Sequence, residues 1–170
     1  DAKRGLVLVA TGDSYIDVPT KGADAIIAYE MATGKVRWQN QVTENDDFIV
    51  GCTRVNKPIN CSAKPGPDYD FGAPPLLMKM KNGKDIVLAG QKSGIIYGMD
   101  PDTGKTLWQT KVGTGSSLGG IEWGLAAYDQ YVYVPNSDIV LLMEVANRKA
   151  GIVVLDDQFH GEPKPGLSAI

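Results

Sequence analysis

Short apolar runs separated by turn-forming residues recur along the whole chain. Residues 5–10, 76–80 and 85–89 are apolar stretches bounded by Gly, Pro or Asn, a pattern typical of β-strands. Asn82-Gly83 lies between the last two runs and is the strongest short signal for a β-hairpin. Residues 130–134 alternate between polar and apolar positions before a proline. The pattern therefore predicts short strands joined by tight turns.

The C-terminal third is less clear. Residues 138–149 fit either a strand or one short helix, because their periodicity does not separate the two. Residues 156–165 are mostly polar and contain two prolines, which favour turns. We therefore expect a solvated loop there. Residues 166–170 resemble the start of another strand, and we expect this strand to have nothing to pair against.

One segment of the chain is repeated. Residues 25–38 read AIIAYEMATGKVRW, and residues 94–108 read GIIYGMDPDTGKTLW. Each copy has an apolar strand, a turn that ends in Thr-Gly-Lys, and a second strand that carries Trp38 or Trp108. Glycine at the turn suits a hairpin because it tolerates positive φ. Both tryptophans are expected to be core aromatics.

The spacing of the repeat indicates a β-propeller with an insertion. The two tryptophans lie 70 residues apart, whereas propeller blades recur at about 40–50 residues. The repeat unit must therefore contain an insertion, and the polar residues 44–71 are the obvious place for it. The predicted fold class is all-β, a partial β-propeller with four-stranded blades.

Composition and charge exclude several classes of protein. The formal net charge of −3 gives no sign of the concentrated basic surface that binds nucleic acid. Hydrophobic residues make up 43% of the chain, which is enough for a packed core. No apolar run approaches the roughly 18 residues of a membrane span. We therefore expect neither a nucleic-acid partner nor a membrane span.

Two cysteines, Cys52 and Cys61, lie nine positions apart in the polar segment. A disulfide would close a small loop there and would imply an oxidising compartment. Two free thiols are the alternative, and a metal or redox pair lacks both a CxxC spacing and a nearby histidine. The sequence leaves the pairing open.

The motifs together resemble the pyrroloquinoline quinone (PQQ)-dependent alcohol dehydrogenase superfamily. The repeated segments resemble its tryptophan-docking motif, A-x-D-x-x-T-G-x-x-x-W. Tyr29-Glu30 stands at the acidic position in the first copy, and Asp100 occupies that position in the second. The resemblance is strongest to the polyvinyl-alcohol-dehydrogenase-like branch. It is carried, in the family's order, by residues 10–15 (ATGDSY), 68–73 (DYDFGA), 90–94 (GQKSG) and 119–124 (GGIEWG).

The resemblance implies an eight-bladed propeller of which this chain covers about three blades. Residues 1–170 are then expected to be a fragment of a single propeller domain, with the remaining blades in the same or another chain. The implied activity is PQQ-dependent oxidation of an alcohol to a carbonyl, with a secondary or polymeric alcohol such as polyvinyl alcohol as one candidate substrate. The implied acceptor is a cytochrome c-type protein, and the implied location is the periplasm or the outside of the cell.

The resemblance also assigns a catalytic base and a metal ligand. Asp70 matches the family's catalytic aspartate, and a carboxylate suits the removal of a hydroxyl proton. Asp68 competes for this role because it lies only two residues away, and either aspartate alternatively caps a turn. Asp13 stands where the family has an asparagine ligand for Ca²⁺, a cation that prefers oxygen ligands. The alternative for Asp13 is a simple turn residue.

Three further residues match positions that contact the quinone. Lys92 matches a basic residue, and a cation stabilises the negative charge that develops on a quinone oxygen. Glu122 and Trp123 stand where relatives have Asn-Trp, and a flat indole suits a planar cofactor. The alternatives are a solvated lysine and an ordinary core tryptophan. Glutamate departs from the family pattern because an ionised carboxylate only accepts hydrogen bonds.

Two other functions remain possible from the sequence. One is a non-enzymatic propeller that scaffolds protein–protein interactions in the bacterial envelope, since such scaffolds share the tryptophan motif. The other is a protein that retains quinone binding without turnover. The segments that contain Asp70, Lys92 and Glu122 are expected, from the resemblance, to lie over the propeller axis. A scaffold would not need them, so they favour the enzyme.

Overall fold

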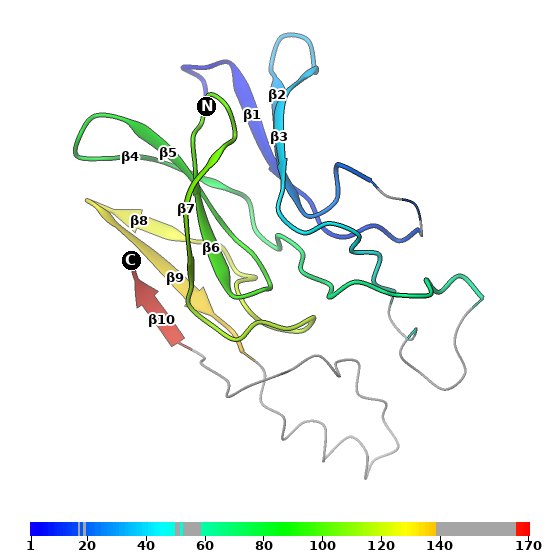
Figure 1. Ribbon diagram of the computed structural model, residues 1–170. Helices are drawn as coiled ribbons and strands as arrows, with labels where there is room; N and C mark the ends of the chain where they lie inside the picture. The colour runs from blue at the N-terminus through cyan, green and yellow to red at the C-terminus, as the bar shows by residue number, and fades with distance from the viewer. Residues whose placement is uncertain (17, 19, 50–51, 53–58, 139–165) are drawn as a thin grey trace.

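The computed structural model contains only antiparallel sheets among the residues that it describes, which are 1–16, 18, 20–49, 52, 59–138 and 166–170. Ten strands form three sheets of three, four and three strands. The sheets follow one another across the molecule in chain order (Figure 1). This confirms the predicted fold class, an all-β partial propeller. The second sheet has the four strands predicted for a blade, whereas the described residues give the first and third sheets three strands each. The described residues include no helix that could span a membrane.

The first sheet is built from β1 (Leu6–Ala10), β2 (Ala25–Glu30) and β3 (Val36–Gln41), in that order. The β2–β3 hairpin is the first copy of the repeat. Its turn closes through the Gly34 amide, which donates to the carbonyl of Glu30 at 2.8 Å.

The second sheet is built from β4 (Leu76–Lys79), β5 (Asp85–Gly90), β6 (Ile95–Met99) and β7 (Thr106–Lys111). The β4–β5 hairpin turns at Asn82-Gly83, as predicted. The β6–β7 hairpin is the second copy of the repeat, and its register shifts between Gly98 and Met99. The first copy shifts at the matching place, between Ala28 and Tyr29. The two copies therefore share their backbone irregularity as well as their sequence.

The third sheet corrects one expectation. It is built from β8 (Ala126–Tyr128), β9 (Tyr131–Asn136) and β10 (Gly166–Ala169), with β9 in the middle. The strand at the C-terminal end was expected to lack a partner, but β10 pairs antiparallel with β9, which comes earlier in the chain. The sequence also missed β8, because three residues are too few for a periodic pattern. The predictions for residues 139–149 and 156–165 lie outside the described residues.

The second sheet is buried on both faces. One core cluster joins it to the first sheet through residues such as Ile26, Trp38, Val87 and Met99. A second cluster joins it to the third sheet and includes Ile86, Leu88, Ile96, Val132 and Val134. Burial on both faces explains why β5 and β6 read as nearly continuous apolar runs rather than as alternating patterns.

Trp38 fastens the first sheet to the turn of the second hairpin. Its side chain is 7% exposed, and its indole Nε1 donates to the carbonyl of Pro101 at 3.0 Å. The Trp38 ring packs so closely on Gly104 that a β-carbon there would overlap it. Trp108, the equivalent residue of the second copy, is only partly buried and packs beside the second core cluster. Trp38 is therefore a core aromatic as expected, and Trp108 is one in part.

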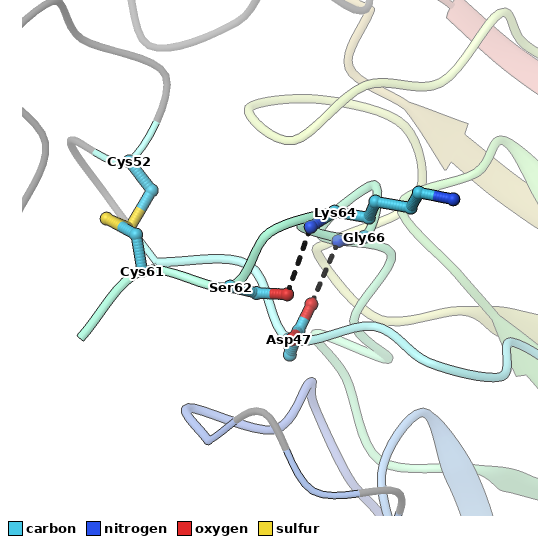
Figure 2. The surroundings of a disulfide bond; sticks show 6 residues. All are labelled: Asp47, Cys52, Cys61, Ser62, Lys64 and Gly66. Carbon is cyan, nitrogen blue, oxygen red and sulfur yellow. Dashed lines mark hydrogen bonds between the residues drawn. A yellow bond between two sulfur atoms is a disulfide. The ribbon is translucent and has the colours of Figure 1, made fainter.

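The polar segment between β3 and β4 contains no strand among its described residues. Cys52 and Cys61 form a disulfide within it, which settles the pairing that the sequence left open (Figure 2). Nearby, the amide of Lys64 donates to Ser62 Oγ at 3.2 Å, and the amide of Gly66 donates to Asp47 Oδ1 at 3.2 Å. The assignment of residues 1–170 to one propeller domain, with an insertion at about 44–71, stays a prediction.

The two repeat copies offer a matched test of the tryptophan contact. Gly34 and Gly104 occupy the same turn position with φ of 69° and 73°, but a β-carbon at Gly34 would meet open space. Gly34→Ala should therefore cost about 1 kcal/mol for the backbone conformation alone. Gly104→Ala should cost at least about 2 kcal/mol more, because it also displaces the Trp38 ring. Urea unfolding of both variants measures the difference, and equal losses would refute the docking contact.

Candidate active site

Two loops from distant parts of the chain are joined beside the first sheet. The loop after β1 carries Asp13, and the segment before β4 carries Asp70. The amide of Phe71 donates to the carbonyl of Thr11 at 3.3 Å, and the amide of Asp13 donates to Asp70 Oδ1 at 2.7 Å. Gly12 is closely covered by the Asp70 carboxylate, which leaves no room for a side chain there. The two predicted site residues are therefore neighbours.

Lys92 completes this group from the second sheet. It lies in the turn between β5 and β6, where its amide donates to the carbonyl of Asp70 at 3.0 Å. Its Nζ lies 2.6 Å from Asp70 Oδ2 and 3.1 Å from Asp68 Oδ1. The Lys92 side chain is only 14% exposed. Lys92 is thus a mostly buried, doubly paired cation, and the alternative of a solvated lysine is wrong.

Three carboxylates form a compact group, and two of them, Asp68 and Asp70, contact this ammonium. Asp13, Asp68 and Asp70 each offer an oxygen atom, and these atoms lie within 4.8 Å of one another. Asp13 Oδ2 is buried and has no hydrogen-bond partner among the described residues. A buried carboxylate oxygen without a partner is costly. This oxygen is therefore available to a cation.

The surroundings shift the pKa values of these groups in different directions. Burial alone would raise the pKa of Asp70, but hydrogen bonds from Lys92 and from the Asp13 amide hold it below its ordinary value. Burial raises the pKa of Asp13 and of Asp68 to about 7 each, with repulsion from Asp70 adding to the effect. Burial opposes the charge on Lys92, yet its bonds to the carboxylates raise its pKa. At neutral pH the pair of Lys92 and Asp70 is therefore fully charged.

Glu122 and Trp123 lie beside this group in different ways. Gly72, next but one to Asp70, packs against the backbone of Glu122. Burial raises the pKa of the Glu122 carboxyl, and Lys92 and Asp70 both act on it electrostatically. Trp123 is 71% exposed, so it is not a core residue. The structure thus brings Asp13, Asp70 and Lys92 together, places Glu122 next to them, and leaves the indole of Trp123 uncovered.

Sequence reasoning missed Asp24, which is fully buried directly before β2. Both of its carboxylate oxygens lack a hydrogen-bond partner among the described residues, and its φ is 45°. The carbonyl of Asp24 accepts a hydrogen bond from the Val42 amide. In the second copy the carbonyl of Gly94 accepts the matching bond from the Val112 amide, so Asp24 occupies the position of that glycine. Burial, followed by repulsion from Asp46, raises its pKa to about 9. Comparing the two copies of the repeat would have drawn attention to this aspartate.

Sequence reasoning also missed Asp46, which lies at the start of the predicted insertion. Its carboxylate accepts hydrogen bonds from the amides of Asp68 and Tyr69, at 2.9 and 2.8 Å. Burial raises its pKa, although these bonds partly offset the effect. No sequence signal marks this contact, because it joins residues more than twenty positions apart across a loop.

The arrangement combines a base, a cation and a set of oxygen ligands. Asp70 is ionised, and each of its oxygens keeps a further lone pair that can accept a proton. Lys92 has three N–H donors, of which the described carboxylates engage two. Asp13 and its neighbours offer the hard oxygen ligands that Ca²⁺ prefers. Such a site can take a proton from a hydroxyl group and stabilise negative charge beside it.

Comparison with known proteins agrees with the resemblance seen in the sequence. The chain is 49% identical over 141 residues to a polyvinylalcohol dehydrogenase of Pseudomonas sp, and 45% identical over 141 residues to one of Sphingopyxis sp. (strain 113P3). Each match covers 82% of this chain and 22% of the relative. The chain therefore spans about a fifth of the length of these relatives. No family profile matches it.

Among solved structures, BamB from Moraxella catarrhalis is similar over 80% of this chain and 45% of its own, with 18% identity and a TM-score of 0.32. The sequence similarity to the two dehydrogenases confirms the family resemblance that the motifs indicated.

The buried Asp24 predicts an unusual dependence of stability on pH. Its pKa is raised on folding, so between about pH 4 and pH 9 the folded protein holds a proton that the unfolded chain releases, and this group's contribution to stability falls as pH rises. Asp24→Asn, which keeps the shape of the protonated acid, should raise the free energy of unfolding by about 2–4 kcal/mol at pH 8 and by little near pH 4. Urea unfolding in the presence of a chelator measures both values.

Asp129 provides the control for this variant. It also has a positive φ, of 55°, but its side chain is 46% exposed. Asp129→Asn should change stability by less than about 0.5 kcal/mol at either pH. If Asp24→Asn were no more stable than wild type at pH 8, the buried carboxyl would not carry the cost assigned to it.

Proposed function

Because the chain is related over most of its length to polyvinylalcohol dehydrogenases, we propose that it forms part of a PQQ-dependent alcohol dehydrogenase. The observation that carries this proposal is the ion pair between Lys92 and Asp70 beside a group of three carboxylates. A structural ion pair on a turn would need no further acids around it. This pair lies among acids whose oxygens remain available, as a site for substrate and cation requires.

The residues present fit a divalent cation. Asp13 Oδ2 is buried and has no hydrogen-bond partner in the part of the chain that the structure describes, and oxygens of Asp68 and Asp70 lie within 4.8 Å of an Asp13 oxygen. These three residues would supply part of the shell of six or more oxygens that Ca²⁺ requires. A cation there would act as a Lewis acid on an adjacent carbonyl oxygen. Its positive charge would also favour the ionised forms of Asp13 and Asp68.

The residues present also fit an anionic quinone. Lys92 retains a donor for a quinone oxygen, and the exposed indole of Trp123 offers a flat surface. Glu122 approaches the same group from the loop between β7 and β8. When bound, PQQ would supply the two-electron acceptor for the hydride equivalent that leaves the alcohol carbon.

Asp70 and Lys92 divide the work of alcohol oxidation. Asp70 accepts the hydroxyl proton of the alcohol. Lys92 holds the Asp70 carboxylate in place and would stabilise negative charge on a quinone oxygen. The hydrogen bond from the Asp13 amide fixes the second oxygen of Asp70. Held from both sides, the carboxylate presents its remaining lone pairs in a fixed direction.

Asp68 is the second candidate for the base. Its pKa of about 7 lies near neutrality, where a general base is most effective, and its φ of 60° shows a constrained backbone. Asp70 is more strongly paired and therefore intrinsically the weaker base. We retain Asp70 as the base because it matches the family's catalytic position, and mutation separates the two.

The substrate, acceptor and location are part of the same proposal. The substrate is an alcohol, with secondary or polymeric alcohols such as polyvinyl alcohol suggested by the names of the two relatives. Electrons pass to a cytochrome c-type acceptor, and the remaining blades complete the propeller. The disulfide between Cys52 and Cys61 is compatible with an oxidising compartment such as the periplasm.

Dye-linked alcohol oxidation by the full-length protein tests the activity. Turnover should require both PQQ and Ca²⁺, and a chelator should abolish it reversibly, because it would remove the Lewis acid proposed for this site. Absence of turnover and of quinone binding in the folded protein would refute the proposal and leave a scaffold role.

Asp70→Asn and Asp68→Asn together identify the base. Asp70→Asn should leave PQQ bound but lower kcat at least about 100-fold, in line with the loss of a general base. Asp68→Asn removes a similar charge from the same ammonium and should lower kcat about tenfold or less. The reverse order of these losses would assign the base to Asp68, and near-normal turnover in both would exclude this group from the mechanism.

A further inference from the structure

Asp46 ties together the two loops that carry the acidic group. It is 2% exposed, and its two carboxylate oxygens accept the amides of Asp68 and Tyr69 at 2.9 and 2.8 Å. Its own carbonyl accepts the amide of Ser14 at 2.9 Å. Ser14 follows Asp13, and Tyr69 precedes Asp70. One residue therefore holds the backbone next to both carboxylates.

The surroundings of Asp46 fix its orientation. A β-carbon on Gly66 would meet the Asp46 backbone and carboxylate, so the chain passes this residue at a distance that only glycine allows. Asn45, which precedes Asp46 in the chain, has φ of 57°, and Asp68 has φ of 60°. Both are uncommon for residues other than glycine. The Asp46 carboxylate accepts the Asp68 amide and so holds the backbone of Asp68 in this conformation.

A nearby acid is a poor choice for a purely structural cap at this place. Burial opposes the charge on Asp46, and Asp70 repels it. A neutral amide side chain would be repelled less by the group, but its single carbonyl oxygen would leave one of the two amides without this acceptor. The carboxylate offers what such a side chain does not, namely two equivalent acceptors for two successive amides.

We propose that Asp46 is a positioning residue that sets the direction of the Asp68 and Asp70 carboxylates toward Lys92 and, through Ser14, the position of Asp13. Its effect on catalysis rests on the proposed function, whereas its effect on the two loops does not. Asp46 does not touch Lys92 in any contact found among the described residues. It acts through the backbone of the segments that do.

Asp46→Asn is the variant that tests this role, because it keeps one acceptor and loses the other. Asp100→Asn is its matched control. Asp100 Oδ1 also accepts two successive amides, those of Asp102 and Thr103 at 3.0 and 2.9 Å, but it lies in the exposed turn of the second hairpin. Both variants are made in the full-length protein and studied by hydrogen–deuterium exchange and steady-state kinetics with a dye acceptor.

Exchange tests the positioning without requiring activity. In Asp46→Asn, peptides that contain residues 13–14 and 68–70 should exchange at least tenfold faster than in wild type. In Asp100→Asn, whose one remaining carbonyl oxygen can still accept both amides, the peptides that contain residues 13–14 and 68–70 should exchange at the wild-type rate. Exchange that stays at the wild-type rate in either site peptide, or rises equally throughout the chain, would overturn the proposal.

Kinetics test the catalytic consequence. Asp46→Asn should lower kcat at least tenfold with less than a threefold change in KM, because the carboxylates shift while the substrate surface remains. A kcat at the wild-type level, or a loss of activity that appeared only as a higher KM, would overturn the catalytic part of the proposal.

If the wild-type full-length protein failed to oxidise alcohols, the proposed function would fall. The exchange results would still decide the role of Asp46 in positioning the two loops.

Discussion

The ion pairs of Lys92 are the interaction on which this site depends. Its ammonium lies 2.6 Å from Asp70 and 3.1 Å from Asp68, in a region where burial makes unpaired charge costly. Among the described residues, Asp13, Asp24 and Asp46 add further acids whose pKa values burial raises. Lys92 decides which of these acids stays ionised. Asp70, which it contacts most closely, is the one whose pKa falls below the ordinary value.

The sheets bring these groups together by packing face to face. Asp13 follows β1 of the first sheet, Lys92 joins β5 to β6 of the second, and Glu122 precedes β8 of the third (Figure 1). The long segment between β3 and β4 supplies the remaining acids. Two apolar cores and the contact of Trp38 with the neighbouring turn hold the sheets in this relation.

The sequence was informative where a physical signal is local or repeated. Apolar runs, Asn82-Gly83 and the two Thr-Gly turns predicted most strands and the all-β fold, because each depends on a few adjacent residues. The family resemblance selected Asp13, Asp70 and Lys92, which the structure brings together. Asp24 and Asp46 escaped notice because burial and a contact across more than twenty residues, rather than a motif, give them their properties. The exposure of Trp123 was equally unpredictable, since it depends on which surfaces cover that loop.

The central claim is that these acids and Lys92 form one site for a quinone and a cation. The most direct measurement is a crystal structure of the full-length protein grown with PQQ and Ca²⁺. We expect density for the quinone within hydrogen-bond distance of Lys92 Nζ, and a cation bonded to Asp13 with Asp70 beside both. A quinone or a cation bound away from these side chains, with the ion pair of Lys92 and Asp70 unchanged and facing solvent, would contradict it.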